Sequence, residues 1–139
     1  MSCRDQAVGA VLVRDGRVLL YHRSAHRRWR PGTWDLPGGH VEPGEEATAA
    51  LVRELNEELA IMAEPPRAAP VSFAAGEFDM HVWILRAWSG EAVNAAPREH
   101  DAIGWFEPSE AAELELALAA YRDPIARAVA GGSAGARLG

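Results

Sequence analysis

Apolar positions along the chain fall first into two neighbouring runs, at residues 7–13 and 17–21, which are joined by an Asp-Gly pair at 15–16. Such a pair favours a β-hairpin, because glycine accepts positive φ at little cost. Residues 80–88 are apolar on both alternations, which indicates an inner strand covered on both faces. A further short strand is predicted at 103–106.

Helical patterns follow these strands. The clearest one runs from about Glu45 to Leu59, where acidic residues in the expected first turn suit the helix dipole. A second helix is predicted from Ser109, its cap, to about residue 121. The pair at 123–124, Asp-Pro, then resembles another helix start, with proline at the first helical position. Strands interrupted by helices predict an α/β protein with one mixed sheet and helices on its faces.

The remaining segments are predicted loops and a tail, and they set the boundaries of the domain. Residues 24–44 and 64–70 contain many helix-breaking residues and are predicted as loops, with a short extended piece at 33–36. The length of 139 residues suits a single domain, which we place at 1–130. Residues 131–139 are small and polar, and we expect a disordered tail there.

Composition narrows the class of protein. No apolar run approaches the ~18 residues that span a bilayer, so we expect a cytoplasmic protein without a membrane segment. The single cysteine, Cys3, fits a reducing compartment. With 14 basic and 20 acidic residues the net charge is −6, which argues against a nucleic-acid polymer as partner. A small anionic substrate stays open, because local charge and bound metal decide that.

Three carboxylates are concentrated in the first predicted helix. At helical spacing Glu54, Glu57 and Glu58 fall within an arc of about 100°. Like charges placed so close repel one another, and a divalent cation removes that repulsion. Oxygen ligands of this kind suit Mg²⁺ or Mn²⁺. Arg53 is placed to fix a neighbouring carboxylate with its planar guanidinium. A solvated acidic helix face is the alternative interpretation of these charges alone.

The segment between Gly39 and Ile61 resembles the Nudix signature, with the spacing Gly-x5-Glu-x7-Arg-Glu-Leu-x-Glu-Glu-x-Ala-Ile. Every position matches except Ala60, where the family usually has glycine. That glycine is expected to end the helix in a left-handed conformation, in which alanine costs about 1 kcal/mol unless the helix lengthens slightly. The N-terminal hairpin and the approach at 34–39 extend the resemblance to the MutT-like branch over about residues 6–126.

This resemblance implies the fold, the cofactor and the site. The fold would be a Nudix-type α/β/α sandwich with a central mixed sheet. Mg²⁺ or Mn²⁺ would be held by the backbone carbonyl of Gly38, by the three helix carboxylates, and by Glu99, which lies six positions before Trp105. A shift in loop register would put Asp101 in the place of Glu99. The residues implied in catalysis are Arg53, Glu54, Glu57, Glu58 and Glu99.

The implied reaction is hydrolysis of a nucleoside triphosphate to a nucleoside monophosphate and pyrophosphate. Modified or oxidised (deoxy)nucleotides are among the options. A carboxylate near the metal takes a proton from water. Glu54, Glu58 and Glu99 all stay open as that base. The partner would be a small nucleotide, and the chain a monomer or a homodimer.

The resemblance also implies contacts to the substrate. An arginine at the position of Arg23 lies near the phosphates in MutT-like proteins, although a surface cation is an equal alternative. The cluster of arginines at 27, 28 and 30 either attracts a triphosphate or forms a solvated loop. Phe78 is a candidate for stacking on the base, with Trp83 and Trp105 as alternatives. Asp123 either contacts a purine edge or only caps a helix, since arginine at 122 replaces the asparagine expected in the branch that acts on oxidised guanine nucleotides.

Two other functions stay open. One is hydrolysis of other nucleoside diphosphate derivatives, namely ADP-ribose, nucleotide sugars or dinucleoside polyphosphates. Those branches carry a proline or a tyrosine after the signature, where this chain has Gly76 and Phe78. The other is a non-catalytic nucleotide-sensing domain, which would usually lack the signature carboxylates retained here.

Overall fold

The computed structural model describes residues 4–129, so the predicted tail lies outside the described residues. Seven strands form one sheet: β1 Asp5–Arg14, β2 Arg17–Arg23, β3 Trp34–Asp35, β4 Gly38–His40, β5 Val71–Ala75, β6 Phe78–Leu85 and β7 His100–Phe106. The helices are α1 Ala47–Leu59, α2 Pro108–Glu113, a 3₁₀ turn at Ala119–Tyr121 and a final helical segment at 122–129. None of the described helices is long and apolar enough to cross a membrane.

The sheet is mixed, as predicted, and is built around β1. Its order is β3-β2-β1-β6-β5, with β4 paired to β1 and β7 paired to β2. β1 runs parallel to β6 and antiparallel to β2 and β4. The predicted hairpin forms at the Asp-Gly pair, where both residues have positive φ. Because β1 has partners on both edges, its backbone polar groups are satisfied along most of its length.

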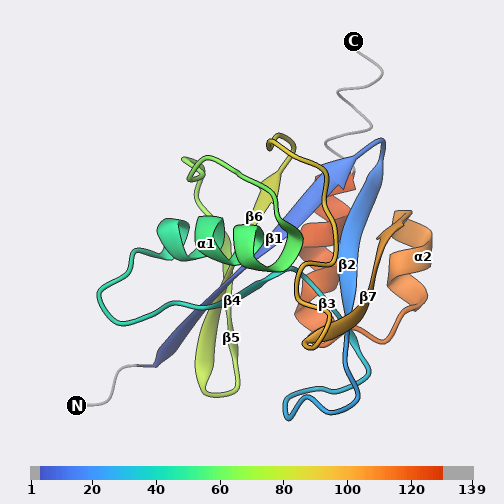
Figure 1. Cartoon of the computed structure of the whole chain (residues 1–139), viewed down its shortest axis with the longest axis horizontal. Helices are drawn as coiled ribbons and strands as arrows, with labels where there is room; N and C mark the ends of the chain where they lie inside the picture. Colours follow the sequence, from blue (N-terminus) through green and yellow to red (C-terminus); the bar gives the residue numbers. More distant parts are fainter. Residues whose placement is uncertain (1–3, 130–139) are drawn as a thin grey trace.

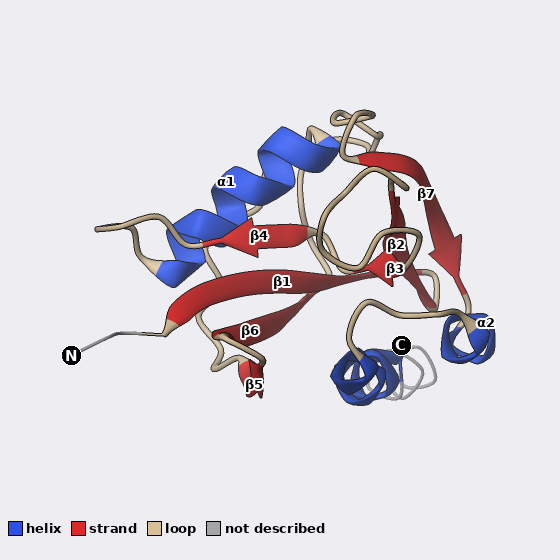
Figure 2. Cartoon of the chain, turned by 90° about the horizontal axis from the view of Figure 1, so that it is seen from below, coloured by secondary structure: helices blue, strands red, loops and turns tan. Residues whose placement is uncertain are grey.

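Alternate residues of β1 face two separate cores. Val8, Ala10 and Leu12 pack with the apolar stripe of α1, whereas Val11 and Val13 pack with the C-terminal segments. Figure 2 shows α1 on one side of the sheet and α2 with the final helix on the other. The α/β/α sandwich is therefore confirmed, and the unbroken apolar run of β1 follows from its burial on both faces.

Several boundaries differ from the sequence prediction. β4 lies inside the segment predicted as a loop, and β5 was not anticipated. The helix α1 begins at Ala47, so Glu45 and Glu46 precede its first turn, which contains no acidic residue. The predicted acidic first turn was therefore wrong, because the carboxylate of Glu45 is held instead by an arginine further along the helix.

The helix predicted from Ser109 to residue 121 is shorter than expected. It begins at Pro108, is capped by Glu107 in a capping box with Glu110, and ends at Glu113. The chain then becomes extended because it pairs with Trp34, whose backbone N–H donates to Glu115 and whose carbonyl accepts from residue 117. Long-range pairing with β3 thus overrides the local helical pattern.

The predicted helix start at 123–124 was also displaced. Residues 122–129 are helical directly after the 3₁₀ turn, so Asp123 lies inside the first helical turn rather than at the N-cap. Its carboxylate pairs with Arg127 one turn along, at 2.9 Å, and both side chains are mostly exposed. This pair belongs to the helix surface.

Ala60 ends α1 in the left-handed conformation expected of the usual glycine. Its φ and ψ are 58° and 32°, and its N–H donates to the carbonyl of Asn56 at 3.0 Å. An alanine side chain in this conformation is close to a carbonyl oxygen and is strained. The helix therefore ends where the family pattern ends it, at a small energetic cost.

Replacing Ala60 with glycine should raise the free energy of unfolding by up to about 1 kcal/mol, because relief of strain exceeds the extra freedom of the unfolded chain. Chemical denaturation measures this. The control is Ala49→Gly, at an exposed position of the same helix, which should be destabilising. Equal destabilisation by both changes would contradict the strain at Ala60.

Candidate functional site

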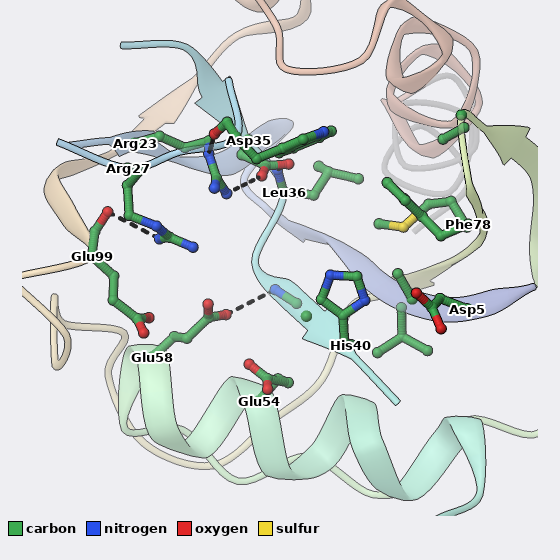
Figure 3. Close-up of a pocket in the computed structure, with 18 of the residues that line it drawn as sticks. Asp5, Arg23, Arg27, Asp35, Leu36, His40, Glu54, Glu58, Phe78 and Glu99 are labelled. Carbon is green, nitrogen blue, oxygen red and sulfur yellow. Dashed lines mark hydrogen bonds and ion pairs between the residues drawn. The ribbon is translucent and has the colours of Figure 1, made fainter. Parts of the chain in front are cut away.

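A cavity of about 810 Å³ opens beside the sheet (Figure 3). Residues from distant parts of the sequence line it, because β1, β2, α1, the β5–β6 turn and the segment before β7 converge there. Carboxylates of α1 form one wall, while arginine and aromatic side chains contribute much of the rest. Figure 1 shows how the sheet brings these segments together from both halves of the chain.

Glu58 is the most buried of these carboxylates, with 4% of its surface exposed. The backbone N–H of Gly38 donates to its Oε1 atom at 2.8 Å. Burial raises the pKa of Glu58 well above its usual range, and the negative charge of Glu54 raises it further. A buried carboxylate with one hydrogen-bond donor and an anionic neighbour is a ready ligand for a cation.

Glu54 lies one turn earlier and faces the strand β4. Burial raises its pKa, although hydrogen bonding to Arg53 acts in the opposite direction. A Cβ atom on Gly39 would lie only 2.6 Å from the carboxylate of Glu54. A Cβ on Gly38 would lie 2.0 Å from the carbonyl oxygen of Val8. The two glycines are thus required by close approach, of a carboxylate in one case and of β1 in the other.

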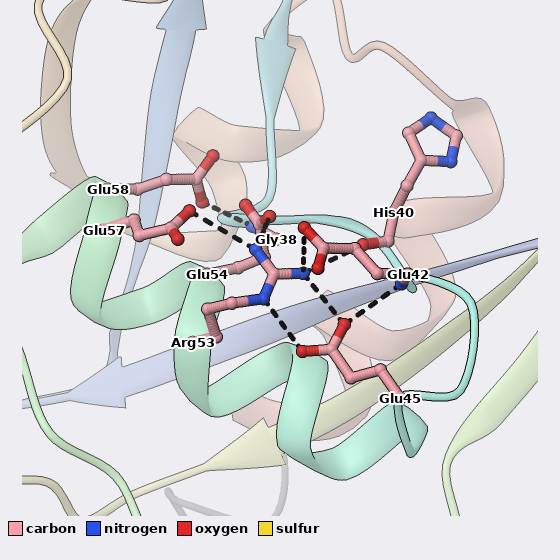
Figure 4. Close-up of polar contacts among 8 residues, drawn as sticks. All are labelled: Gly38, His40, Glu42, Glu45, Arg53, Glu54, Glu57 and Glu58. Atoms are coloured by element: carbon pink, nitrogen blue, oxygen red, sulfur yellow. Dashed lines mark hydrogen bonds and ion pairs between the residues drawn. The ribbon is translucent and has the colours of Figure 1, made fainter.

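Arg53 organises the outer part of this acidic wall (Figure 4). Its Nε atom donates to Glu45 at 2.8 Å, and its Nη1 atom donates to Glu54 at 2.7 Å and to Glu57 at 3.3 Å. Its Nη2 atom also donates to the carbonyl of His40. Hydrogen bonding to Arg53 lowers the pKa of Glu45 to about 2. One guanidinium therefore fixes several carboxylates but does not neutralise them all.

Glu99 brings a further carboxylate from the segment before β7. Ligand atoms of Glu58, Glu99 and His100 all lie within 4.8 Å of one another. Asp101, the alternative position, does not line the cavity and instead contacts His22 at 2.7 Å. The structure thus brings together Glu54, Glu58 and Glu99 around one space, whereas the more exposed Glu57 is not among the cavity residues and pairs with Arg53 at 3.3 Å.

These carboxylates suit a divalent cation by their chemistry. They are hard oxygen donors, they repel one another, and Glu54 and Glu99 each raise the pKa of Glu58.

His100 was not anticipated. It is fully buried and stacked on Tyr21, with ring centroids 4.1 Å apart, and burial lowers its pKa. Its ring packs on Tyr21, which lines the cavity.

Arg23, the predicted phosphate contact, lies on the opposite wall but is engaged within the protein. Its Nη1 atom pairs with Asp35 at 3.1 Å, and both side chains are buried. Its Nε atom donates to the carbonyl of Trp29 at 2.7 Å, and its guanidinium lies 4.9 Å from the centroid of the Trp29 ring. Burial raises the pKa of Asp35, although Arg23 partly offsets this.

Phe78 lies at the start of β6 and lines the cavity, as a base-stacking residue would. It contacts the rings of Trp29 and His40 edge-on, at 5.8 and 5.7 Å between centroids. Sequence reasoning singled out neither Trp29 nor Asp35. For Asp35, its place between the tryptophan and the glycines of the 34–39 approach was an available signal.

The other predicted base contact lies elsewhere. Asp123 and Arg122 are not among the cavity residues, which include their neighbour Tyr121. Among the three arginines of the 27–30 cluster, Arg27 and Arg28 line the cavity and Arg30 does not. Two positions of the predicted cluster therefore belong to the site.

Comparison with known proteins gives a consistent result. A family profile described as the NUDIX domain matches residues 4–129. The CTP pyrophosphohydrolase of Escherichia coli (strain K12) is 36% identical over 115 residues, covering 81% of this chain and 82% of that protein.

Solved structures agree with this. A MutT NUDIX hydrolase from Burkholderia pseudomallei is 35% identical with a TM-score of 0.68, over 78% of this chain and 87% of that chain. A MutT protein from Methanosarcina mazei Go1 is 26% identical with a TM-score of 0.69, over 92% and 94% of the two chains.

Replacing Glu58 with glutamine should stabilise the metal-free protein at pH 8. Because the folded-state pKa of Glu58 is raised, its contribution is most favourable when it is protonated, and stability is lost as pH rises from about 4.5 through the folded pKa. Glutamine keeps an acceptor for Gly38 and removes the charge, so a gain of at least about 1 kcal/mol is expected. Denaturation in chelator from pH 5 to 8 measures it.

Two controls accompany this measurement. Glu91→Gln removes an exposed carboxylate and should leave the pH dependence unchanged. Added Mg²⁺ should stabilise the wild-type protein more than Glu58→Gln. If the wild-type and Glu58→Gln proteins lose stability in parallel as the pH rises, ionisation of Glu58 is not the cause of that loss.

Replacing Arg23 with glutamine should cost about 3–5 kcal/mol of folding stability, because it leaves the buried carboxylate of Asp35 without its partner. The double variant Arg23→Gln with Asp35→Asn should recover much of that loss. Chemical denaturation of the two single variants and the double variant tests this. A loss below about 1 kcal/mol for Arg23→Gln would show that the Arg23–Asp35 pair does not stabilise this side of the cavity.

Proposed function

The chain belongs to the Nudix family and is a hydrolase of its MutT-like branch, and from this premise we propose that it converts nucleoside triphosphates to nucleoside monophosphates and pyrophosphate with Mg²⁺ or Mn²⁺. The observation that carries the proposal is the cavity itself. One wall holds the carboxylates of Glu54, Glu58 and Glu99, and the rest carries arginine and aromatic side chains. That division suits a substrate with a metal-bound phosphate end and a flat base.

The residues proposed to hold the cation are the carboxylates of Glu54, Glu57, Glu58 and Glu99 and the backbone carbonyl of Gly38. Burial of Glu54 and Glu58 and repulsion by neighbouring carboxylates support this, since both pKa values are raised in the protein alone. A bound divalent cation supplies a water molecule of lowered pKa and neutralises charge on phosphate oxygens.

The chain's own residues prepare that chemistry. Gly38 fixes Glu58 through its backbone N–H, and Arg53 fixes Glu54 through a short charge-assisted hydrogen bond. The attacking water gives its proton to one of the cavity carboxylates, Glu54, Glu58 or Glu99. Preorganisation of this kind reduces the motion needed during the reaction.

The nucleoside would lie toward the aromatic side of the cavity. Phe78 and Trp29 already contact each other there, and either ring offers an apolar face to a base. Similarity to a CTP pyrophosphohydrolase over most of both chains supports a nucleoside triphosphate rather than a nucleotide sugar. Asp123 lies outside the cavity, so the proposal assigns it no contact with the base.

A nucleotide screen tests the proposal. The wild-type protein is incubated with Mg²⁺ and canonical or oxidised nucleoside triphosphates, ADP-ribose, nucleotide sugars and dinucleoside polyphosphates, and released phosphate and pyrophosphate are measured separately. We expect pyrophosphate from triphosphates, no turnover in chelator, and a loss of at least about 100-fold in kcat for Glu57→Gln and Glu58→Gln.

The outcomes separate the alternatives. Turnover of ADP-ribose alone would replace triphosphates with another nucleoside diphosphate derivative. Nucleotide binding without turnover of any compound would favour a sensing role. Near wild-type turnover in both glutamate variants would remove the metal site from the mechanism.

A further inference from the structure

Arg23 is poorly placed to exchange partners with a substrate. Only 6% of its surface is exposed, and its Nε and Nη1 atoms already donate to the carbonyl of Trp29 and to the carboxylate of Asp35. Release of Arg23 to a phosphate would leave the carboxylate of Asp35 buried and unpaired. The positively charged side chain that contacts the phosphates should therefore be another residue on the same side of the cavity.

Arg27 has the opposite character. It is partly exposed and lines the cavity, and its Nη1 atom donates to the backbone carbonyl of Glu99 at 3.1 Å. Figure 3 shows its guanidinium pointing into the cavity above Glu58, on the side from which Glu99 also enters. Among the ion pairs formed by residues 4–129, none includes Arg27. Its charge is available to a ligand.

The backbone around Arg27 holds it in this position. Its own N–H donates to the carbonyl of Ser24, and the N–H of Ser24 donates to the same Glu99 carbonyl that Arg27 contacts. The turn at 24–27 is thus tied at both ends to the segment that carries Glu99. Arg28 also lines the cavity, but no described hydrogen bond within residues 4–129 holds its side chain.

We infer that Arg27, rather than Arg23, contacts the phosphates of the substrate, with the Glu99 carbonyl as its anchor. The inference rests on the proposed function, since it assumes a substrate with a phosphate chain. A phosphate chain held by the carboxylate-bound cation would lie between Glu58 and Arg27. A guanidinium binds phosphate oxygens through charge-assisted, paired hydrogen bonds. Arg23 instead positions Asp35 and Trp29.

The test compares Arg27→Gln with Arg30→Gln, which removes the same charge from the same loop but outside the cavity. For nucleoside triphosphate with Mg²⁺, kcat/KM should fall roughly 10- to 100-fold for Arg27→Gln and less than about 2-fold for Arg30→Gln. Arg27→Lys should recover part of the loss, because lysine keeps the charge without the paired donors.

A binding measurement makes the result independent of turnover. Affinity for inorganic tripolyphosphate with Mg²⁺, measured by calorimetry, should fall about 10-fold or more in Arg27→Gln. Affinity for Mn²⁺ alone should stay within about 2-fold of wild type, because Arg27 is proposed to meet the phosphates and not the cation. Arg23→Gln, measured where it remains folded, should lose less tripolyphosphate affinity than Arg27→Gln.

Three results would overturn the inference. Arg27→Gln could match Arg30→Gln in both assays, Arg23→Gln could lose more tripolyphosphate affinity than Arg27→Gln, or Arg27→Gln could lose Mn²⁺ affinity as strongly as tripolyphosphate affinity. The last result would show that Arg27 only holds Glu99. If the wild-type protein turned over no triphosphate, the proposed function would fail, whereas the tripolyphosphate measurement would still decide the role of Arg27.

Discussion

The structure depends on one electrostatic constraint. Carboxylates on the same face of α1 lie beside one another and are partly or fully buried. Glu58 is almost completely buried, Glu54 is one turn away, and Glu99 approaches from another segment. The guanidinium of Arg53 compensates only the outer part of this group. A folded protein keeps such an arrangement at a cost in stability, and a bound cation removes that cost.

The backbone around these carboxylates follows from the same constraint. β4 must pass so close to α1 that Gly39 has no room for a side chain beside Glu54. Gly38 must approach β1 equally closely while it points its N–H at Glu58. The packing of α1 on one face of β1 sets both distances. The glycines, the helix and the central strand therefore form one unit, in which a change in spacing would move the carboxylates.

The side of the cavity opposite α1 presents positive charge, although the protein has a net charge of −6. One arginine is buried and neutralised by Asp35, so it stiffens the wall. A second, Arg27, is anchored only to a backbone carbonyl and keeps its charge unpaired by carboxylates within residues 4–129. Because that carbonyl belongs to Glu99, the segment before β7 both contributes a carboxylate to the cavity and positions the guanidinium of Arg27.

The sequence by itself determined the elements whose signals are local. The Asp-Gly hairpin, the apolar strands and the helix with three carboxylates on one arc all follow from period, turn chemistry and spacing. The family signature added the reaction type and the expectation of a metal-binding role. It also singled out Glu99, because the tryptophan of β7 fixes the register of the segment before it.

Only the tertiary structure decided which side chains share the cavity and which are already engaged. The helix predicted across residues 114–118 gave way to pairing with Trp34, and the pair at 123–124 became part of a helix surface away from the cavity. Arg23 and Arg27 are both candidate phosphate contacts in the sequence and both line the cavity, yet Arg23 is buried in an ion pair with Asp35, whereas Arg27 is partly exposed and forms no ion pair within residues 4–129. That distinction depends on burial and on partners far apart along the chain, and local pattern carries no information about either.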